Sequence, residues 1–224
     1  MTFSLVARCA ETGMLGMAVS SSSPAVAARC AHARAGVGAV ASQNVTDPAL
    51  GAQTLDLMAG GLSAKAALRQ VITEAPHIEY RQLVVIDARG ETALYSGANV
   101  LGTWGEARGQ DVASAGNLLA RHDVPSAIVA AFEASQGHLG DRLITALRAG
   151  LSAGGEAGPV YSAGLMLMDK VNWPVAELRC DWTENCPIED VAAAWAVYKP
   201  QLDDYVRRAL DPSLAPSYGV PGDA

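Results

Sequence analysis

Apolar and polar residues alternate from the start of the chain. In TFSLVAR, Phe3, Leu5 and Ala7 fall on one face and the residues between them on the other. This period of two predicts a β-strand that begins at residue 2. AETGM then predicts a hairpin turn, with Gly13 at the position that needs a positive φ. A second strand follows in LGMAVSSSS.

The second predicted strand has one face of small side chains, Gly16, Ala18 and Ser20. Such a face lets another element lie close against the sheet. Ser20 belongs to the run SSSSP and is a candidate substrate-binding residue. The alternative role of these serines is to cap or turn the backbone, because serine hydroxyls readily bond to nearby main-chain groups.

The remaining pattern predicts strands in hairpins and helices in pairs. The helical stretch after Pro48 is interrupted at AGGLS, where Ser63 can cap a second helix. The expected elements are, in order, a strand over 35–43, helices within 48–74, a hairpin around 88–90, a strand over 111–119, helices over 125–135 and 139–149, strands within 161–169 and 174–182, and a helix over 188–210 bent at Pro200.

This order of elements favours antiparallel sheets covered by paired helices over a doubly wound parallel sheet. The sequence shows neither a domain linker nor an internal repeat. We therefore expect one domain over residues 1–210, in which 188–210 is a C-terminal helix. The Pro/Gly-rich segment 211–224 is expected to be a tail that lies loosely on the surface.

Charge and hydropathy exclude several classes of function. The formal net charge is −7, with 16 Lys and Arg against 23 Asp and Glu. A chain of this charge has no basic stripe for nucleic-acid phosphates and is not expected to bind a membrane surface. The sequence shows no apolar run of the roughly 18–20 residues that a spanning helix needs, and no secretory leader. We expect a cytoplasmic protein.

The sequence gives no support for a metal or a cofactor. GVGAV lacks the third glycine and the strand-turn-helix context of a dinucleotide-binding loop. The four histidines form no HxxxH or HExxH pair, so no catalytic metal is expected. The four cysteines are too scattered for a disulfide framework and are expected to be reduced and structural.

The N-terminus carries candidate chemistry of its own. Removal of Met1 would leave Thr2 as the first residue, with a hydroxyl nucleophile and an α-amine whose pKa is about 7.7–8.0. One residue would then supply both nucleophile and base. An oxyanion hole at Gly116–Asn117 and a cation, Arg29 or Arg34, would complete such a site. The alternative for Gly116–Asn117 is a turn in which asparagine tolerates a left-handed φ.

Five blocks of this sequence resemble, in order, an uncharacterised prokaryotic family of Ntn-hydrolase-like proteins. Members of that family typically open with TFSIVA and carry ARAGVGAVATQ and GNML. The resemblance runs from Thr2 to about Leu178. The blocks in this chain are TFSLVARCAETGMLGMAVSSSSPAV, ARAGVGAVASQN, GLSAKAAL, RQLVVIDARGETALYSG and AGNLLA.

The resemblance implies an α+β fold, a four-layer αββα sandwich of two antiparallel sheets. It also implies hydrolysis of an amide bond in a small molecule or short peptide, without a cofactor, by a homodimer or higher homo-oligomer. Thr2 would be nucleophile and base, and Asn117 with the Gly116 backbone would stabilise the oxyanion. Arg34 would lower the pKa of the amine or hold a substrate carboxylate. The candidate substrate-binding residues are Ser20, Gly116 and Ser42–Gln43, which match TQ except for serine at 42.

A second interpretation stays open at this point. If Met1 is retained, the nitrogen of Thr2 is an amide and cannot act as a base. The protein would then be a non-catalytic member that binds a metabolite or serves as an assembly subunit.

Overall fold

Two antiparallel β-sheets form the centre of the protein, which the computed structural model describes over residues 1–220. The larger sheet consists, in spatial order, of β10 (Ala176–Cys180), β9 (Ser162–Met168), β2 (Leu15–Ser21), β1 (Thr2–Arg8), β8 (Val112–Asn117) and β7 (Gly105–Gly109). The smaller sheet consists of β3 (Ala31–Arg34), β4 (Gly38–Asn44), β5 (Arg81–Asp87) and β6 (Thr92–Ser96).

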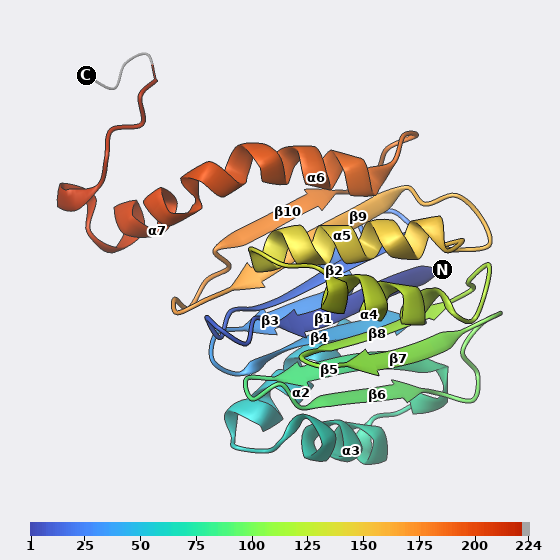
Figure 1. The fold of residues 1–224 in the computed structure, drawn as a ribbon. Coiled ribbons are helices and arrows are strands. Elements are labelled where there is room, and N and C mark those ends of the chain that lie inside the picture. Colours follow the sequence, from blue (N-terminus) through green and yellow to red (C-terminus); the bar gives the residue numbers. More distant parts are fainter. Residues whose placement is uncertain (221–224) are drawn as a thin grey trace.

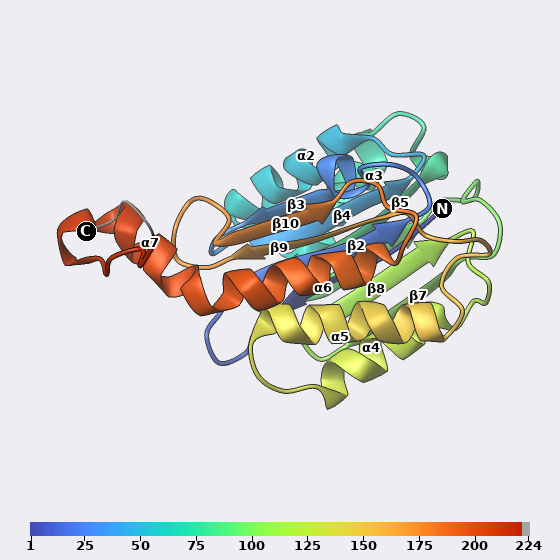
Figure 2. The ribbon, with the colours of Figure 1, turned by 90° about the horizontal axis from the view of Figure 1, so that it is seen from above.

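Helices cover the outer face of each sheet, as Figures 1 and 2 show. The helices on the larger sheet are α4 (Val124–Ala134), α5 (Leu139–Ser152) and α6 (Pro187–Tyr198). Those on the smaller sheet are α2 (Pro48–Ala59) and α3 (Ala64–Glu74), and the short α1 (Ala27–Cys30) precedes β3. The αββα sandwich expected from the sequence is therefore confirmed.

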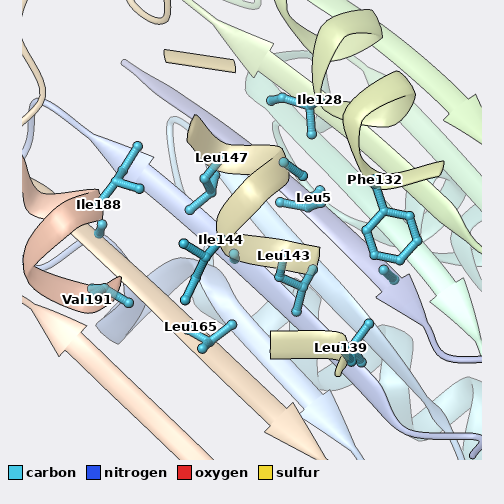
Figure 3. Close-up of a cluster of buried hydrophobic side chains, with 14 of the residues drawn as sticks. Leu5, Ile128, Phe132, Leu139, Leu143, Ile144, Leu147, Leu165, Ile188 and Val191 are labelled. Carbon is cyan, nitrogen blue, oxygen red and sulfur yellow. The ribbon is translucent and has the colours of Figure 1, made fainter. Parts of the chain in front are cut away.

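Strand alternation distributes side chains between an outer and an inner core. Phe3 and Leu5 of β1 face the helices of the larger sheet, where Leu5 lies among side chains of α4 and α5 (Figure 3). Val6 faces the other way and packs with Val84 and Ile86 of β5 between the two sheets. The central strands are buried on both faces for this reason.

The small face of β2 receives α5, as the sequence predicts. A Cβ added at Gly16 would lie 2.8 Å from Cδ2 of Leu167, 2.9 Å from the carbonyl oxygen of Met166 and 3.0 Å from Cδ1 of Leu143 on α5. Helix α5 can therefore lie directly on β2 because residue 16 has no side chain.

Two strands are absent from the sequence prediction, which placed a loop before residue 35 and no strand between the hairpin around 88–90 and residue 111. Both β3 and β7 lie at the edges of their sheets, and none of the residues of β3 is fully buried. Edge strands need no continuous apolar face, so AHAR and GEARG give no alternating signal.

The predicted C-terminal helix is divided at Pro200. A 3₁₀ segment, Lys199–Gln201, separates α6 from α7 (Leu202–Leu210). A further 3₁₀ turn at Pro212–Leu214 opens the predicted tail, of which residues 221–224 lie outside the described part of the chain. Helices α2 and α3 lie within the predicted 48–74, α4 is shifted by one residue, α5 continues to Ser152, and α1 lies where a loop was predicted. Oγ of Ser63 caps α3 by accepting from the Ala66 N–H.

Candidate N-terminal active site

Thr2 lies at one end of the sandwich, where the first strand of the larger sheet begins (Figure 1). It pairs with Asn117, the last residue of β8, and β2 ends nearby at Ser21. By strand alternation the side chain of Thr2 is on the same face as Val6, between the two sheets, and Thr2 is only 5% exposed. The first hydroxyl of the chain is therefore inside the molecule.

Three hydroxyls connect the N-terminus to an arginine. The carbonyl oxygen of Met1 accepts hydrogen bonds from Oγ1 of Thr2 and from Oγ of Ser21. The hydroxyls of Thr2 and Ser21 are 3.4 Å apart, and that of Ser23 is 2.8 Å from that of Ser21. Nη2 of Arg29 donates to Oγ of Ser23 at 2.9 Å. Arg29, one of two expected cations, is thus linked to this site.

Next to the hydroxyls, three buried side-chain amides connect the two sheets by hydrogen bonds. Nε2 of Gln43 on β4 donates to Oε1 of Gln82 on β5 at 2.8 Å, and Oε1 of Gln43 accepts from Oγ of Ser4 at 2.6 Å. Nδ2 of Asn117 donates to the same Oε1 of Gln82 at 3.0 Å. We call Gln43, Gln82 and Asn117 the amide chain.

The amide chain has a fixed direction. Nε2 of Gln82 donates to the carbonyl oxygen of Gly116 at 3.1 Å, so the other atom of that amide must be its oxygen. That oxygen can only accept, which obliges Asn117 to present its NH₂ group to it. Oδ1 of Asn117 is then left buried and without a hydrogen-bond partner among residues 1–220. The residue paired with Thr2 therefore offers an unused acceptor.

This geometry leaves Asn117 one N–H for the expected oxyanion role. An oxyanion needs a hydrogen-bond donor; one of the two N–H groups of the Asn117 amide donates to Gln82, and no other described hydrogen bond uses the second. Gly116 lies inside the sheet opposite Phe3 and Gly105, its carbonyl accepts from Gln82, and its missing side chain leaves room for Leu119, 2.7 Å from where a Cβ would lie. Two hydroxyls donate to a carbonyl oxygen at this site, those of Thr2 and Ser21.

A buried carboxylate lies next to the hydroxyls. Both oxygens of Glu156 accept from the main-chain N–H of Ser22, at 3.1 and 3.2 Å, and Glu156 is 3% exposed. Burial raises the pKa of Glu156 to about 7, while the bond from Ser22 and the positive N-terminal amine of Met1 act in the opposite direction. The charge of the N-terminus therefore favours the ionised form of this carboxyl group.

The backbone is strained just after Asn117. Leu118 has φ 50°, a left-handed conformation that costs a residue with a side chain roughly 1–2 kcal/mol. Its N–H donates to the carbonyl of Leu101, and its own carbonyl accepts from Ala157, at 3.0 Å each. These bonds hold the end of β8 against the loop that carries Glu156. Strain of this kind is often found at functional sites.

Three predicted site residues lie elsewhere. Ser20 faces the helix side of the larger sheet and donates to the carbonyl of Ser162, and Ser42 faces α2 and donates to the carbonyl of Asp47. Arg34 pairs with Gly38, five residues along β4 from Gln43, or roughly 16 Å. Arg34 forms an exposed ion pair with Asp56 at 2.8 Å. The expected roles of these three residues at Thr2 are therefore not supported.

Sequence reasoning missed Ser21, Gln82 and Glu156. Ser21 shares a face with the large apolar residues of β2 and not with the small ones, so the alternation itself could have found it. Gln82 is a polar residue at the start of an apolar strand on the same face as Val84. Glu156 comes from a loop, GGEAG, whose sequence gives no signal of burial.

Other parts of the described chain offer little alternative chemistry. Residues 1–220 contain no cluster of three or more His, Cys, Asp or Glu placed to hold a metal ion. Within the same range no helix is long and apolar enough to cross a bilayer. A cavity of about 670 Å³ at the opposite end of β1 is lined by residues that include Cys9, His138 and Arg142. None of the predicted site residues lines that cavity.

Comparisons with solved structures place this fold among known ones. A crystal structure of a protein from Silicibacter pomeroyi is 26% identical, with a TM-score of 0.83 over 92% of this chain and 94% of that one. HslV from Trypanosoma brucei (TM-score 0.45, 10% identity, 75% and 99% covered) and Anbu, an ancestral beta-subunit, from Yersinia bercovieri (0.41, 10%, 92% and 97%) are more distant.

The family is shown by the sequence match. No curated protein matches the chain. Residues 2–191 match the sequence model of a family of unknown function, DUF1028, to which the Silicibacter protein is also assigned. The match extends beyond Leu178, where the expected resemblance ended, into α6. The chain therefore belongs to the family of unknown function DUF1028.

Proposed function

We propose that this protein is an N-terminal-nucleophile amidohydrolase in which Thr2, after removal of Met1, is both nucleophile and base. The observation that carries the proposal is the unused acceptor beside Thr2. Asn117 pairs with Thr2 across the two strands, and its Oδ1 is buried without a hydrogen-bond partner, whereas the other atoms of the amide chain have one. A buried carbonyl oxygen without a donor is costly. The free α-amine of Thr2 would supply that donor.

The reaction follows from this arrangement. Oγ1 of Thr2 attacks the carbonyl carbon of the substrate amide, and its proton passes to the α-amine. Oγ of Ser21 donates to the negative oxygen of the tetrahedral intermediate, as it donates to the carbonyl oxygen of Met1. The C–N bond breaks as the amine returns the proton to the leaving nitrogen. Water, deprotonated by the same amine, then cleaves the ester on Thr2 and releases a carboxylic acid.

In this proposal Asn117 and the amide chain act on the amine of Thr2. A hydrogen bond from the amine N–H to Oδ1 of Asn117 orients the nitrogen lone pair, and the links to Gln82 and Gln43 hold that oxygen in place. Arg29 acts through Ser23 and Ser21, whose hydroxyl it polarises. Both are positioning roles in this proposal.

The test is acylation of Thr2. Protein expressed without a tag should be one methionine lighter than its gene product in intact-mass spectra. A β-lactone, which acylates hydroxyl nucleophiles, should then add one acyl group, mapped to Thr2. Thr2→Ala should lower this labelling at least about 10³-fold, because no hydroxyl is left to form the ester.

The control is Thr73→Ala, which removes an exposed threonine hydroxyl on α3. It should label like the wild type. Met1 retained on all molecules, or full labelling of Thr2→Ala, would overturn the proposed function.

A second function is favoured by one observation, the hydrogen bond between the carbonyl of Met1 and the hydroxyl of Thr2. With Met1 retained, Thr2 lacks a free amine, and the protein could only bind a metabolite or serve in an assembly. The homodimer or higher homo-oligomer expected from the sequence stays a prediction under both functions.

A further inference from the structure

Met1 occupies the position that an acyl group must reach during the proposed reaction. Its carbonyl oxygen lies on the hydroxyls of Thr2 and Ser21, the nucleophile and the oxyanion donor of that reaction. Met1 is joined to the nitrogen of Thr2, so chemically it is an aminoacyl group with a free α-amine. The structure therefore displays an aminoacyl group in the site.

Two segments enclose this group. On one side, the carbonyl of Met1 is bound by Ser21, and the next residue, Ser22, binds Glu156. On the other side, the methyl of the Met1 side chain lies 3.9 Å from where a Cβ of Gly158 would be. Met1 thus lies in the same part of the molecule as Glu156, the only buried carboxylate at this end of the described chain, and the positive charge of its α-amine lowers the pKa of that carboxyl.

From this arrangement we infer that the substrates are aminoacyl amides with a free α-amino group, such as the N-terminal residue of a short peptide, and that Glu156 binds this group. Ser21 holds the acyl oxygen, and Glu156 pairs with the ammonium. Since Met1 is 37% exposed and Gly158 adds no side chain, the site should accept amino acids of different size. The inference rests on the proposed function for the step that follows binding.

Glu156 has no other structural task that requires a charge. Its described hydrogen bonds come from Ser22 alone, and it forms no salt bridge with a side chain or with the N-terminus within residues 1–220. A carboxylate buried without a cation is costly. An ammonium ligand that arrives with the substrate removes this cost, and an N-acetylated substrate does not.

Binding is tested first, without turnover. Processed Thr2→Ala protein, prepared without Met1, is titrated calorimetrically with L-methioninamide and with N-acetyl-L-methioninamide. We expect the free amine to bind at least about 10-fold more tightly, the range of a charge-assisted hydrogen bond. A second substitution in the same protein, Glu156→Gln, should remove this difference in affinity. Adding Glu11→Gln, an exposed residue of the β1–β2 turn, should leave it unchanged.

Turnover is tested with processed protein that retains Thr2, on alanyl and methionyl coumarylamides and their N-acetyl forms. We expect kcat/KM to be at least about 10-fold higher for the free amines. Glu156→Gln should lower it for the free amines by about 10–100-fold and for the acetylated forms by less than about 3-fold. Thr2→Ala should abolish both.

The outcomes separate the two proposals. Equal binding or equal hydrolysis of free and acetylated compounds would overturn the inference, while loss of activity in Thr2→Ala would still uphold the proposed function. An equal effect of Glu156→Gln on both substrate forms would place Glu156 on the amine of Thr2 and also overturn the inference. Selective binding of methioninamide without acylation of Thr2 would uphold the binding site and overturn the proposed function.

Discussion

At the residue scale, the inner core changes from apolar to polar towards one end. Val6, Ala41 and Val84 fill its centre, whereas Gln43, Gln82 and Asn117 fill the end next to Thr2. Buried amides are stable only when each is hydrogen-bonded. The network satisfies every amide atom of these three residues except Oδ1 of Asn117. A satisfied network of this kind holds a single arrangement, which a catalytic group requires.

Glu156 should make the stability of the protein depend on pH. Its pKa is about 7 in the folded chain and near 4.5 when solvated, because burial disfavours the charged form. Between these values the folded state binds more protons than the unfolded state, so stability falls as the pH rises from about 4.5 to about 7. The loss from this residue is at most about 3 kcal/mol.

Urea unfolding of wild type and Glu156→Gln at about pH 5 and about pH 8 measures this effect. The variant should lose less free energy of unfolding between the two pH values than the wild type loses. Glu11→Gln, exposed in the β1–β2 turn, should behave like the wild type. An identical pH dependence in wild type and Glu156→Gln would contradict a raised pKa for Glu156.

At the element scale, the contact between α5 and β2 depends on the absence of a side chain at residue 16. Leu143 and Leu147 of α5 pack in the outer core with Leu5 of β1 (Figure 3). Helix α5 therefore covers the strand that pairs with β1 and that ends at Ser21, beside Thr2.

Gly16→Ala should destabilise the protein by about 1–3 kcal/mol, the cost of overpacking a core. The new methyl would lie 2.8 Å from Leu167 and 2.9 Å from a main-chain oxygen that cannot rotate away. Without this clash, alanine would stabilise a strand relative to glycine. Thermal or urea unfolding measures the change, with Gly158→Ala as the control because its Cβ would meet only Met1, at 3.9 Å. An unchanged or higher stability of Gly16→Ala would refute the close contact.

At the scale of the whole molecule, the C-terminal helices differ in their importance. Helix α6 contributes Ile188, Val191 and Trp195 to the outer core. Helix α7 extends away from the sheets in Figures 1 and 2, and Leu202 is its one buried residue. The sequence matches the family only as far as residue 191.

Deletion of residues 203–224 should change Tm by less than about 4 °C, since it removes no fully buried side chain of the described chain and about 1 kcal/mol corresponds to 2–4 °C in a domain of this size. β-Lactone labelling of Thr2 should persist. Deletion from Pro187 should instead prevent stable folding, because it empties part of the outer core. A large loss of Tm on the shorter deletion would show that α7 stabilises the domain.

Sequence patterns by themselves determined the central strands, the paired helices and their antiparallel arrangement. Continuous apolar alternation marks buried strands such as β1, β2 and β5, and local caps such as Ser63 mark helix starts. Edge strands were missed because their stability comes from a neighbouring strand and not from an apolar face. The sequence also placed Thr2 at the start of a strand, which is a local property.

Only the tertiary structure decided which polar residues surround Thr2. Ser20 and Ser21, or Ser42 and Gln43, are neighbours in sequence but point to opposite faces of their strands. Their assignment depends on which face meets the other sheet and which meets a helix. Glu156 reaches the site from a distant loop, through main-chain contacts that have no local sequence signal. Asn117, which the sequence did indicate, is brought to Thr2 by the register of β1 and β8. The composition of the site is therefore a consequence of how two sheets stack.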